Sequence, residues 1–107
     1  RREPGNDWIV IQLGTSGFVD EIEIDTAHFK GNFPDKCSIQ AALVEKGFDV
    51  NSAENWKELM PKQSLSADAI HKFKKEIVND FGPVNAIRLN IYPDGGVSRL
   101  RIFGKAL

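Results

Sequence analysis

The sequence has 107 residues, of which 41% are hydrophobic and 27% are charged, and its 14 basic and 15 acidic side chains give a net charge of −1. These proportions predict one globular domain with a single modest core. Because basic and acidic residues alternate along the chain, the sequence offers no basic surface for nucleic acid or for an anionic membrane, and we expect neither as a partner.

Cysteine content and the chain ends indicate the compartment. Cys37 is the only cysteine, so an intrachain disulfide is excluded. No stretch resembles a signal peptide or reaches the ~20 apolar residues of a transmembrane helix. We therefore expect a reducing intracellular location, the cytoplasm. The first residues, "RREPGNDW", lack an initiator Met, which suggests a piece of a longer chain. A terminal targeting signal could then be missing from this piece, so a peroxisomal location is also compatible with the sequence.

The first half of the chain favours β-structure. Residues 8–13, "WIVIQL", predict a strand, and the "GTSG" that follows predicts a turn. Residues 18–25 alternate Ile22 and Ile24 with acidic residues, which is typical of a half-buried strand. The segment "TAHFKGNFPD" predicts a long irregular loop. A further strand is predicted over 37–44, with these side chains on one side: Cys37, Ile39, Ala41 and Leu43.

The second half is less uniform. In residues 45–67 the stretch "WKELMP" fits either a short strand or one helical turn ended by Pro61. Residues 68–78 fit both periodicities, with a slight preference for helix. Residues 84–92 and 96–103 alternate clearly and flank a Pro-Asp-Gly-Gly turn, which predicts a hairpin. Five or six short strands with at most one helix predict an antiparallel β-sandwich rather than βαβ units.

Two loops hold the polar residues that could carry chemistry. The sequence lacks a phosphate-binding glycine loop, a zinc-type Cys pair and a Gly-x-Ser-x-Gly elbow, so we expect no metal site and identify no cofactor. One cluster contains Asp25, His28, Lys30 and Asn32. The other contains Asp94, Arg99 and Arg101.

His28 has two interpretations. It follows Asp25 by three residues, so that carboxylate could orient the imidazole for proton transfer near neutral pH. The more common role is that of a loop histidine bonded to a nearby carbonyl. A metal site on Asp25 and His28 is disfavoured because two ligands do not make a site.

The two arginines also have two interpretations. Either could bind a substrate carboxylate through its planar pair of donors, or could pair across strands with Glu21 or Glu23. For Arg101 we favour the surface pair. Three aromatic residues are expected to be packing residues rather than platforms for a ligand: Trp8, Trp56 and Phe103.

Two long segments, "EIDTAHFKGNFPDKCSIQAAL" and "NIYPDGGVSRLRIFG", resemble the allantoicase family, the hydrolases of purine degradation that split allantoate into ureidoglycolate and urea by acting on C–N bonds of a linear amidine. "RREPGNDWIVIQLG" is similar to the family segment that follows an Asp-Gly-Trp-Glu-Thr motif. The resemblance covers nearly the whole chain and is weakest over 45–80.

The resemblance implies a fold and a domain organisation. Allantoicases consist of two related repeats, each an all-β antiparallel jelly-roll sandwich of the galactose-binding or discoidin-like type, and residues 1–107 resemble most of one repeat, the second. This fold implies that 68–78 is a strand with His71 and Phe73 near its start. It also implies that the Pro-Asp-Gly-Gly turn belongs to a ligand-facing loop, where glycines let backbone amides approach a small polar substrate.

The substrate implied by the resemblance suggests a role for each polar residue of the two clusters. Allantoate carries one carboxylate and two ureido groups, so we assign Arg99 to the carboxylate and Asp94 with Asn32 to the ureido groups. Asp25 and His28 would transfer the proton, and Lys30 would add positive potential.

The competing hypotheses are a non-catalytic discoidin-like module that binds a carbohydrate or another small ligand, and a repeat whose catalytic loops have decayed. The expected partners are allantoate, the second repeat and further copies in a homo-oligomer. The isolated 107 residues are expected to show little hydrolysis and marginal folding, because an uncovered sheet edge or core face costs stability.

Overall fold

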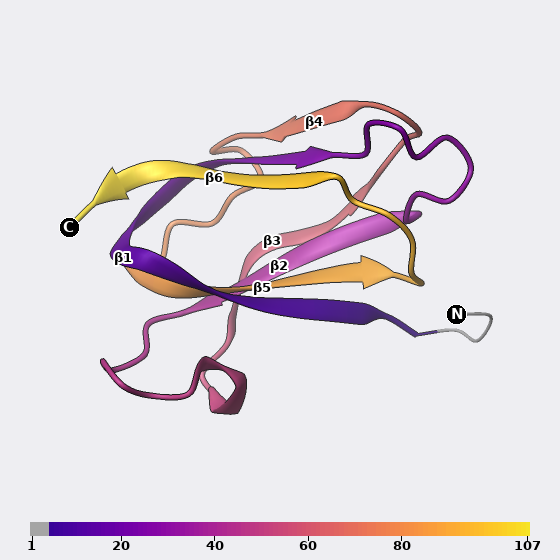
Figure 1. Ribbon diagram of the computed structural model, residues 1–107. Coiled ribbons are helices and arrows are strands. Elements are labelled where there is room, and N and C mark those ends of the chain that lie inside the picture. The colour runs from indigo at the N-terminus through magenta and orange to yellow at the C-terminus, as the bar shows by residue number, and fades with distance from the viewer. Residues whose placement is uncertain (1–4) are drawn as a thin grey trace.

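Six antiparallel strands form two layers in the computed structural model, which describes residues 5–107 (Figure 1). One layer has the strand order β3-β2-β5-β1, and the other is formed by β4 and β6 on either side of β1. The predicted all-β antiparallel sandwich is therefore confirmed. The strand bounds are Asp7–Asp25 for β1, Lys36–Ala42 for β2, Lys57–Ser64 for β3, Ile70–Phe73 for β4, Val84–Tyr92 for β5 and Arg99–Ala106 for β6; a short 3-10 helix, η1, covers Val50–Ser52.

Strand β1 belongs to both layers. Its first half pairs with β5 and its second half with β4 and β6, and the register shifts between Gln12 and Gly17. The predicted turn at "GTSG" is therefore wrong, because the strand bends there from one layer into the other. Close approach of β6 explains the glycine: a Cβ on Gly17 would lie 2.5 Å from the carbonyl oxygen of Lys105.

The core lies between the layers and follows the predicted alternation. Ile22 and Ile24 of β1 face Ile39 of β2 and Ile87 of β5, and all four are fully buried. Leu43 differs from the prediction: it lies beyond the end of β2 and is exposed. No helix within residues 5–107 has the length and apolar character needed to cross a membrane.

Two ambiguous segments form strands. "WKELMP" lies mostly in β3, so the alternative of a helical turn is wrong. Pro61 is tolerated there because β3 is the outer strand of its layer, where the lack of a backbone N–H need not break a pair. In the stretch 68–78, residues Ile70–Phe73 form β4, as the family resemblance implied, and a hydrogen-bonded turn follows, with the N–H of Val78 donating to Lys74 O.

The predicted hairpin of the last two strands is wrong. β5 lies between β1 and β2, so both of its edges are already paired, whereas β6 pairs with β1 in the other layer. Residues 93–98 therefore cross from one layer to the other. Ser98 anchors this crossing by donating from its backbone N–H (2.8 Å) and its hydroxyl (3.0 Å) to the carbonyl oxygen of Asp25.

Candidate functional site

Loops 26–35 and 93–98 carry His28, Lys30, Asn32 and Asp94 and pack directly against each other, whereas Asp25 and the two arginines lie on the adjoining ends of β1 and β6. The Gly96 N–H donates to the carbonyl oxygen of Asn32 at 2.7 Å. A Cβ on Gly95, whose φ is +128°, would lie 2.7 Å from Phe33 C, and a Cβ on Gly96 would overlap the ring of Phe29. Contact between the loops therefore explains both glycines. The Gly96 amide is bonded to protein, which differs from the expectation that it faces a substrate.

Thr26 anchors the start of the first loop. Its side chain is fully buried, and its hydroxyl donates to the carbonyl oxygen of Ser66 (2.7 Å), with Ala69 O also nearby at 3.2 Å, and accepts from the Ala69 N–H (3.1 Å). The backbone N–H of Thr26 also donates to Ala69 O. One residue thus joins loop 26–35 to the segment before β4.

Replacing Thr26 by Val is expected to destabilise the protein by about 1–3 kcal/mol, because the buried hydroxyl and its hydrogen bonds to Ser66 and Ala69 are lost. The melting temperature of the full-length protein measures this loss. Thr15→Val is the matched control, since Thr15 is exposed and its hydroxyl donates to the neighbouring Ser16 O at 3.3 Å. An equal effect of the two substitutions would contradict the anchoring role.

Asp25 and Arg99 lie opposite each other, as register partners on β1 and β6. Together they line a small recess of about 70 Å³, which also includes Glu23 and Arg101. Arg99 also lines a larger cleft, of about 360 Å³. Within the described part of the chain the exposed Arg99 side chain forms no ion pair. Its guanidinium can therefore meet an anion from solution.

His28 projects from the first loop without a bond to Asp25. Its backbone has φ 72°, its side chain is exposed, and its N–H donates to Asp68 Oδ1 at 2.8 Å. Asp25 Oδ1 accepts instead from the Ala27 N–H at 2.8 Å. Over residues 5–107 no hydrogen bond or ion pair joins Asp25 to His28, and none engages the His28 ring. The imidazole is therefore accessible. Neither predicted contact of the ring, with Asp25 or with a nearby carbonyl, is present among residues 5–107.

The other predicted residues occupy the same end of the sandwich. Lys30 and Asn32 are exposed in the first loop, and the Asn32 carbonyl oxygen accepts the hydrogen bond from the Gly96 N–H. Asp94 is half-buried in the second loop and has an interaction of its own. The loop contact therefore brings Asn32 and the Asp94 segment close together. Their proposed roles stay predictions.

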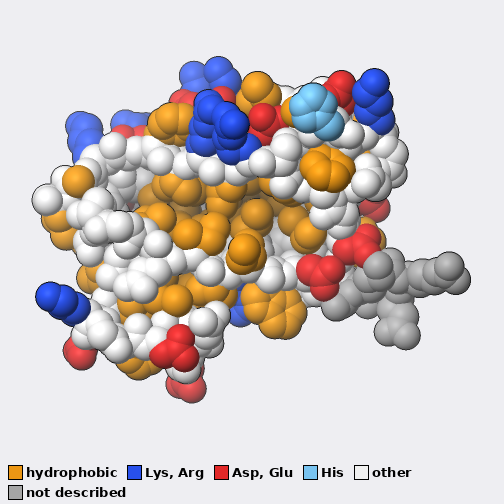
Figure 2. Space-filling view, in the orientation of Figure 1, with side chains coloured by type: hydrophobic (Ala, Val, Ile, Leu, Met, Phe, Trp, Pro, Cys, Tyr) orange, Lys and Arg blue, Asp and Glu red, His pale blue; other side chains and the backbone are white. Residues whose placement is uncertain are grey.

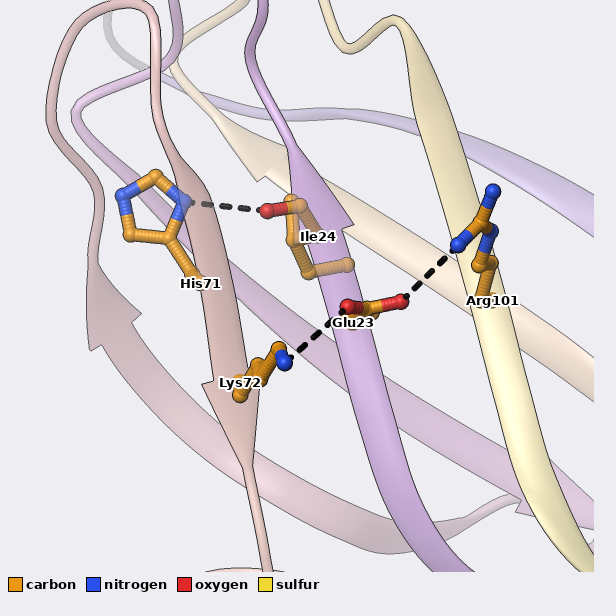
Figure 3. A network of polar contacts seen from close by, with 5 residues as sticks. All are labelled: Glu23, Ile24, His71, Lys72 and Arg101. Carbon is orange, nitrogen blue, oxygen red and sulfur yellow. Dashed lines mark hydrogen bonds and ion pairs between the residues drawn. The ribbon is translucent and has the colours of Figure 1, made fainter.

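Glu23 is shared by two cations on the outer face of the second layer (Figure 3). Arg101 approaches it at 3.5 Å and Lys72 at 4.0 Å, from β6 and β4 on either side of β1. The predicted surface pair of Arg101 with Glu23 is present. Arg101 is thereby engaged, while its neighbour Arg99 is not.

His71 has a structural role (Figure 3). The Ser66 N–H donates to its Nε2 at 2.9 Å, so Nε2 carries the lone pair and Nδ1 carries the proton that is donated to Ile24 O at 3.0 Å. The ring also stacks on Phe73, with centroids 6.4 Å apart. Within the described residues, His28 is thus the histidine whose ring makes no hydrogen bond.

The larger cleft opens between the layers, and Figure 2 shows hydrophobic side chains within this hollow. It is lined by the start of β1, the end of β5 and residues 95–100, including Asp7, Trp8, Ile9 and Ser98. Sequence reasoning missed this surface because it took residues 8–13 only as a strand and did not consider which apolar side chains that strand leaves uncovered. The packing role assigned to Trp8 and Phe103 is wrong, since they are 57% and 43% exposed. The apolar pair Ile9 and Ile11 on one side of that strand is the signal that could have indicated the cleft.

The described residues support neither a cysteine nucleophile nor a metal site. Burial raises the pKa of the Cys37 thiol to about 12, so Cys37 is a neutral thiol near pH 7 and a poor nucleophile. Residues 5–107 contain no group of three or more His, Cys, Asp or Glu side chains that could hold a metal ion.

Comparison with known proteins identifies the family. The family model described as "Allantoicase repeat" matches residues 1–107. A "Probable allantoicase" of Photobacterium profundum is 56% identical over 97% of this chain and 32% of its own length, and one of Stutzerimonas stutzeri is 53% identical over 100% of this chain and 33% of its own length. The chain thus spans about a third of the length of these curated relatives.

Solved structures agree with this assignment. The crystal structure of allantoicase from Saccharomyces cerevisiae is 36% identical, covers 98% of this chain and 29% of its own, and superposes with a TM-score of 0.79. The C-terminal domain of a chitobiase from Bacteroides fragilis, at 18% identity and a TM-score of 0.71, covers 98% of this chain and 67% of its own and shows the fold alone. On the match over its whole length, this chain belongs to the allantoicase family.

Proposed function

We propose that the full protein containing this chain hydrolyses allantoate to ureidoglycolate and urea. The family match over all 107 residues is the observation that carries the proposal. Because the relatives are about three times as long, we further propose that this chain is one repeat, that a second repeat accompanies it, and that the protein assembles as a homo-oligomer.

Arg99 is proposed to bind the substrate carboxylate. It has no ion-pair partner among residues 5–107, it stands at the mouth of the larger cleft, and a guanidinium binds a carboxylate through two parallel hydrogen bonds. Asn32 and Asp94, on the two loops in contact, are proposed to bind the ureido groups. This arrangement would hold the reacting carbon between β6 and the loops.

Proton transfer is proposed for His28, with help from Asp25. The exposed imidazole can donate a proton to the departing urea nitrogen, since histidine changes charge near neutral pH. Asp25 keeps its second carboxylate oxygen available after Oδ1 accepts from Ala27. Lys30, exposed on the same loop, would favour the anionic substrate.

Direct measurement of urea release from allantoate by the purified full-length protein tests the proposal. Turnover supports it. Binding of allantoate without urea release would support a discoidin-like binding module instead, and neither binding nor turnover would indicate a decayed repeat. The measurement discriminates the three because each predicts a different pair of results.

Replacing Arg99 by Ala in the full-length protein is expected to raise KM and lower turnover, because a lost charge-assisted bidentate contact costs about 1.5–3 kcal/mol. Steady-state kinetics measure the effect. Arg101→Ala is the control from the same strand and should affect the kinetics less, since Arg101 is already paired with the largely buried Glu23. Unchanged kinetics in a folded Arg99→Ala protein would remove Arg99 from the site.

A further inference from the structure

The outer face of the layer β3-β2-β5-β1 contains a polar recess of about 350 Å³, which the proposed reaction does not use. The strand register builds it. Val10, Arg88, Gln40 and Glu58 form one row across the four strands, because each pairs with the next. A neighbouring row places Asn90 between Trp8 and Ser38.

The floor of the recess is a hydrogen-bonded network. The side chains of Ser38 and Asn90 are buried. The Ser38 hydroxyl bonds to the Tyr92 hydroxyl at 2.9 Å, and Asn90 Nδ2 donates to Gln40 Oε1 at 3.3 Å. Asn90 Oδ1 in turn accepts from Asn6 Nδ2 at 3.2 Å. These contacts hold the amides and hydroxyls in fixed orientations.

Arg88 lies in this recess without a hydrogen-bond partner among residues 5–107. Its Nε is buried and unsatisfied, and within residues 5–107 none of its guanidinium donors makes a hydrogen bond or an ion pair. Its Cζ lies over the Trp8 ring, 4.7 Å from the centroid, so a cation–π contact with the indole helps to position the guanidinium. A buried donor without a partner is costly. A ligand that supplied acceptors to Arg88 would remove that cost.

We propose that this recess binds a small carboxylate whose other end carries N–H donors, such as a ureido or amide compound. The carboxylate lies against Arg88, because a planar guanidinium positioned by Trp8 matches the two oxygens of that group. Glu58 lines the same recess and forms no ion pair within residues 5–107, so its carboxylate is open to accept from the N–H donors. The site is separate from the loops around Arg99 and does not depend on the reaction proposed there.

Titration calorimetry of the full-length protein with N-carbamoylglycine, which has one carboxylate and one ureido group, tests the proposal. The protein carries Arg99→Gln, so that the loop site does not contribute a carboxylate contact. Adding Arg88→Gln is expected to weaken binding roughly 10- to 100-fold. Arg101→Gln, added instead, is the matched control and leaves the affinity unchanged, because Arg101 lies on the other layer, paired with Glu23.

A second measurement needs no substitution in the recess. N-carbamoylglycinamide lacks the anionic charge and is expected to bind the Arg99→Gln protein at least 10-fold more weakly than N-carbamoylglycine. Equal affinity for the two compounds, or an Arg88→Gln protein that folds and binds normally, would overturn the proposal. A crystal structure of the full-length protein with another segment filling the recess would also overturn it. Urea release, measured in parallel, reports on the proposed reaction alone.

Discussion

Replacing His28 by Asn in the full-length protein is expected to reduce turnover by roughly 10²-fold or more, which is the usual effect of losing a general acid or base. The melting temperature should stay unchanged. The stability expectation follows from the backbone. His28 has φ 72°, a conformation that Asn adopts readily, and its N–H contact with Asp68 does not involve the side chain. Urea-release kinetics and thermal unfolding measure the two quantities.

His71→Asn is the matched control for this prediction. Both ring nitrogens of His71 are bonded within the protein, to Ser66 and Ile24, so its replacement should lower the melting temperature. A stable His28→Asn protein with full activity would exclude proton transfer by His28 and leave the acid to a residue outside this chain. A large loss of stability with a proportionate loss of activity would favour a structural role.

The fold was predictable where alternation is strict and unpredictable where pairing is long-range. Residues 84–92 alternate so clearly that β5 was bounded correctly. The continuity of β1 through "GTSG" could not be predicted, because the glycine at 17 is required by β6, about ninety residues later in the chain, and not by a local turn. The same holds for the supposed hairpin: the Pro-Asp-Gly-Gly sequence favours a local turn, but both edges of β5 are already occupied, and residues 93–98 instead cross irregularly to the other layer.

The candidate site was predictable at the level of loops rather than of contacts. The polar residues of 26–35 and 93–98 indicated two functional loops, and the structure places those loops together. The pairing of Asp25 with His28 was inferred from their spacing alone. Spacing could not show that the Asp25 carboxylate accepts a hydrogen bond from the Ala27 N–H instead. Arg88 was missed because a polar residue on an alternating strand normally faces solvent, whereas here the register of four strands forms a recess.

Replacing Gly96 by Ala is the second large effect that we expect, and it acts on both stability and activity. A Cβ at this position would lie 2.0 Å from an atom of the Phe29 ring, far inside contact distance. The ring or the loop must move, and overpacking of this kind typically costs about 1–3 kcal/mol or more. The movement also weakens the bond from Gly96 to Asn32, which positions the two loops. We expect a lower melting temperature together with a strongly reduced rate of urea release.

Two further variants make the expectation specific to this contact. Gly31→Ala lies in the same pair of loops with no atom within 4 Å of the added Cβ, so it should change neither quantity. Phe29→Ala combined with Gly96→Ala should lose less stability than the sum of the two single substitutions, because removal of the ring makes room for the methyl group. If the two effects simply added, the clash with Phe29 would not be the cause. If Gly96→Ala lowered stability but left turnover intact, the loop contact would hold the fold together without positioning the site.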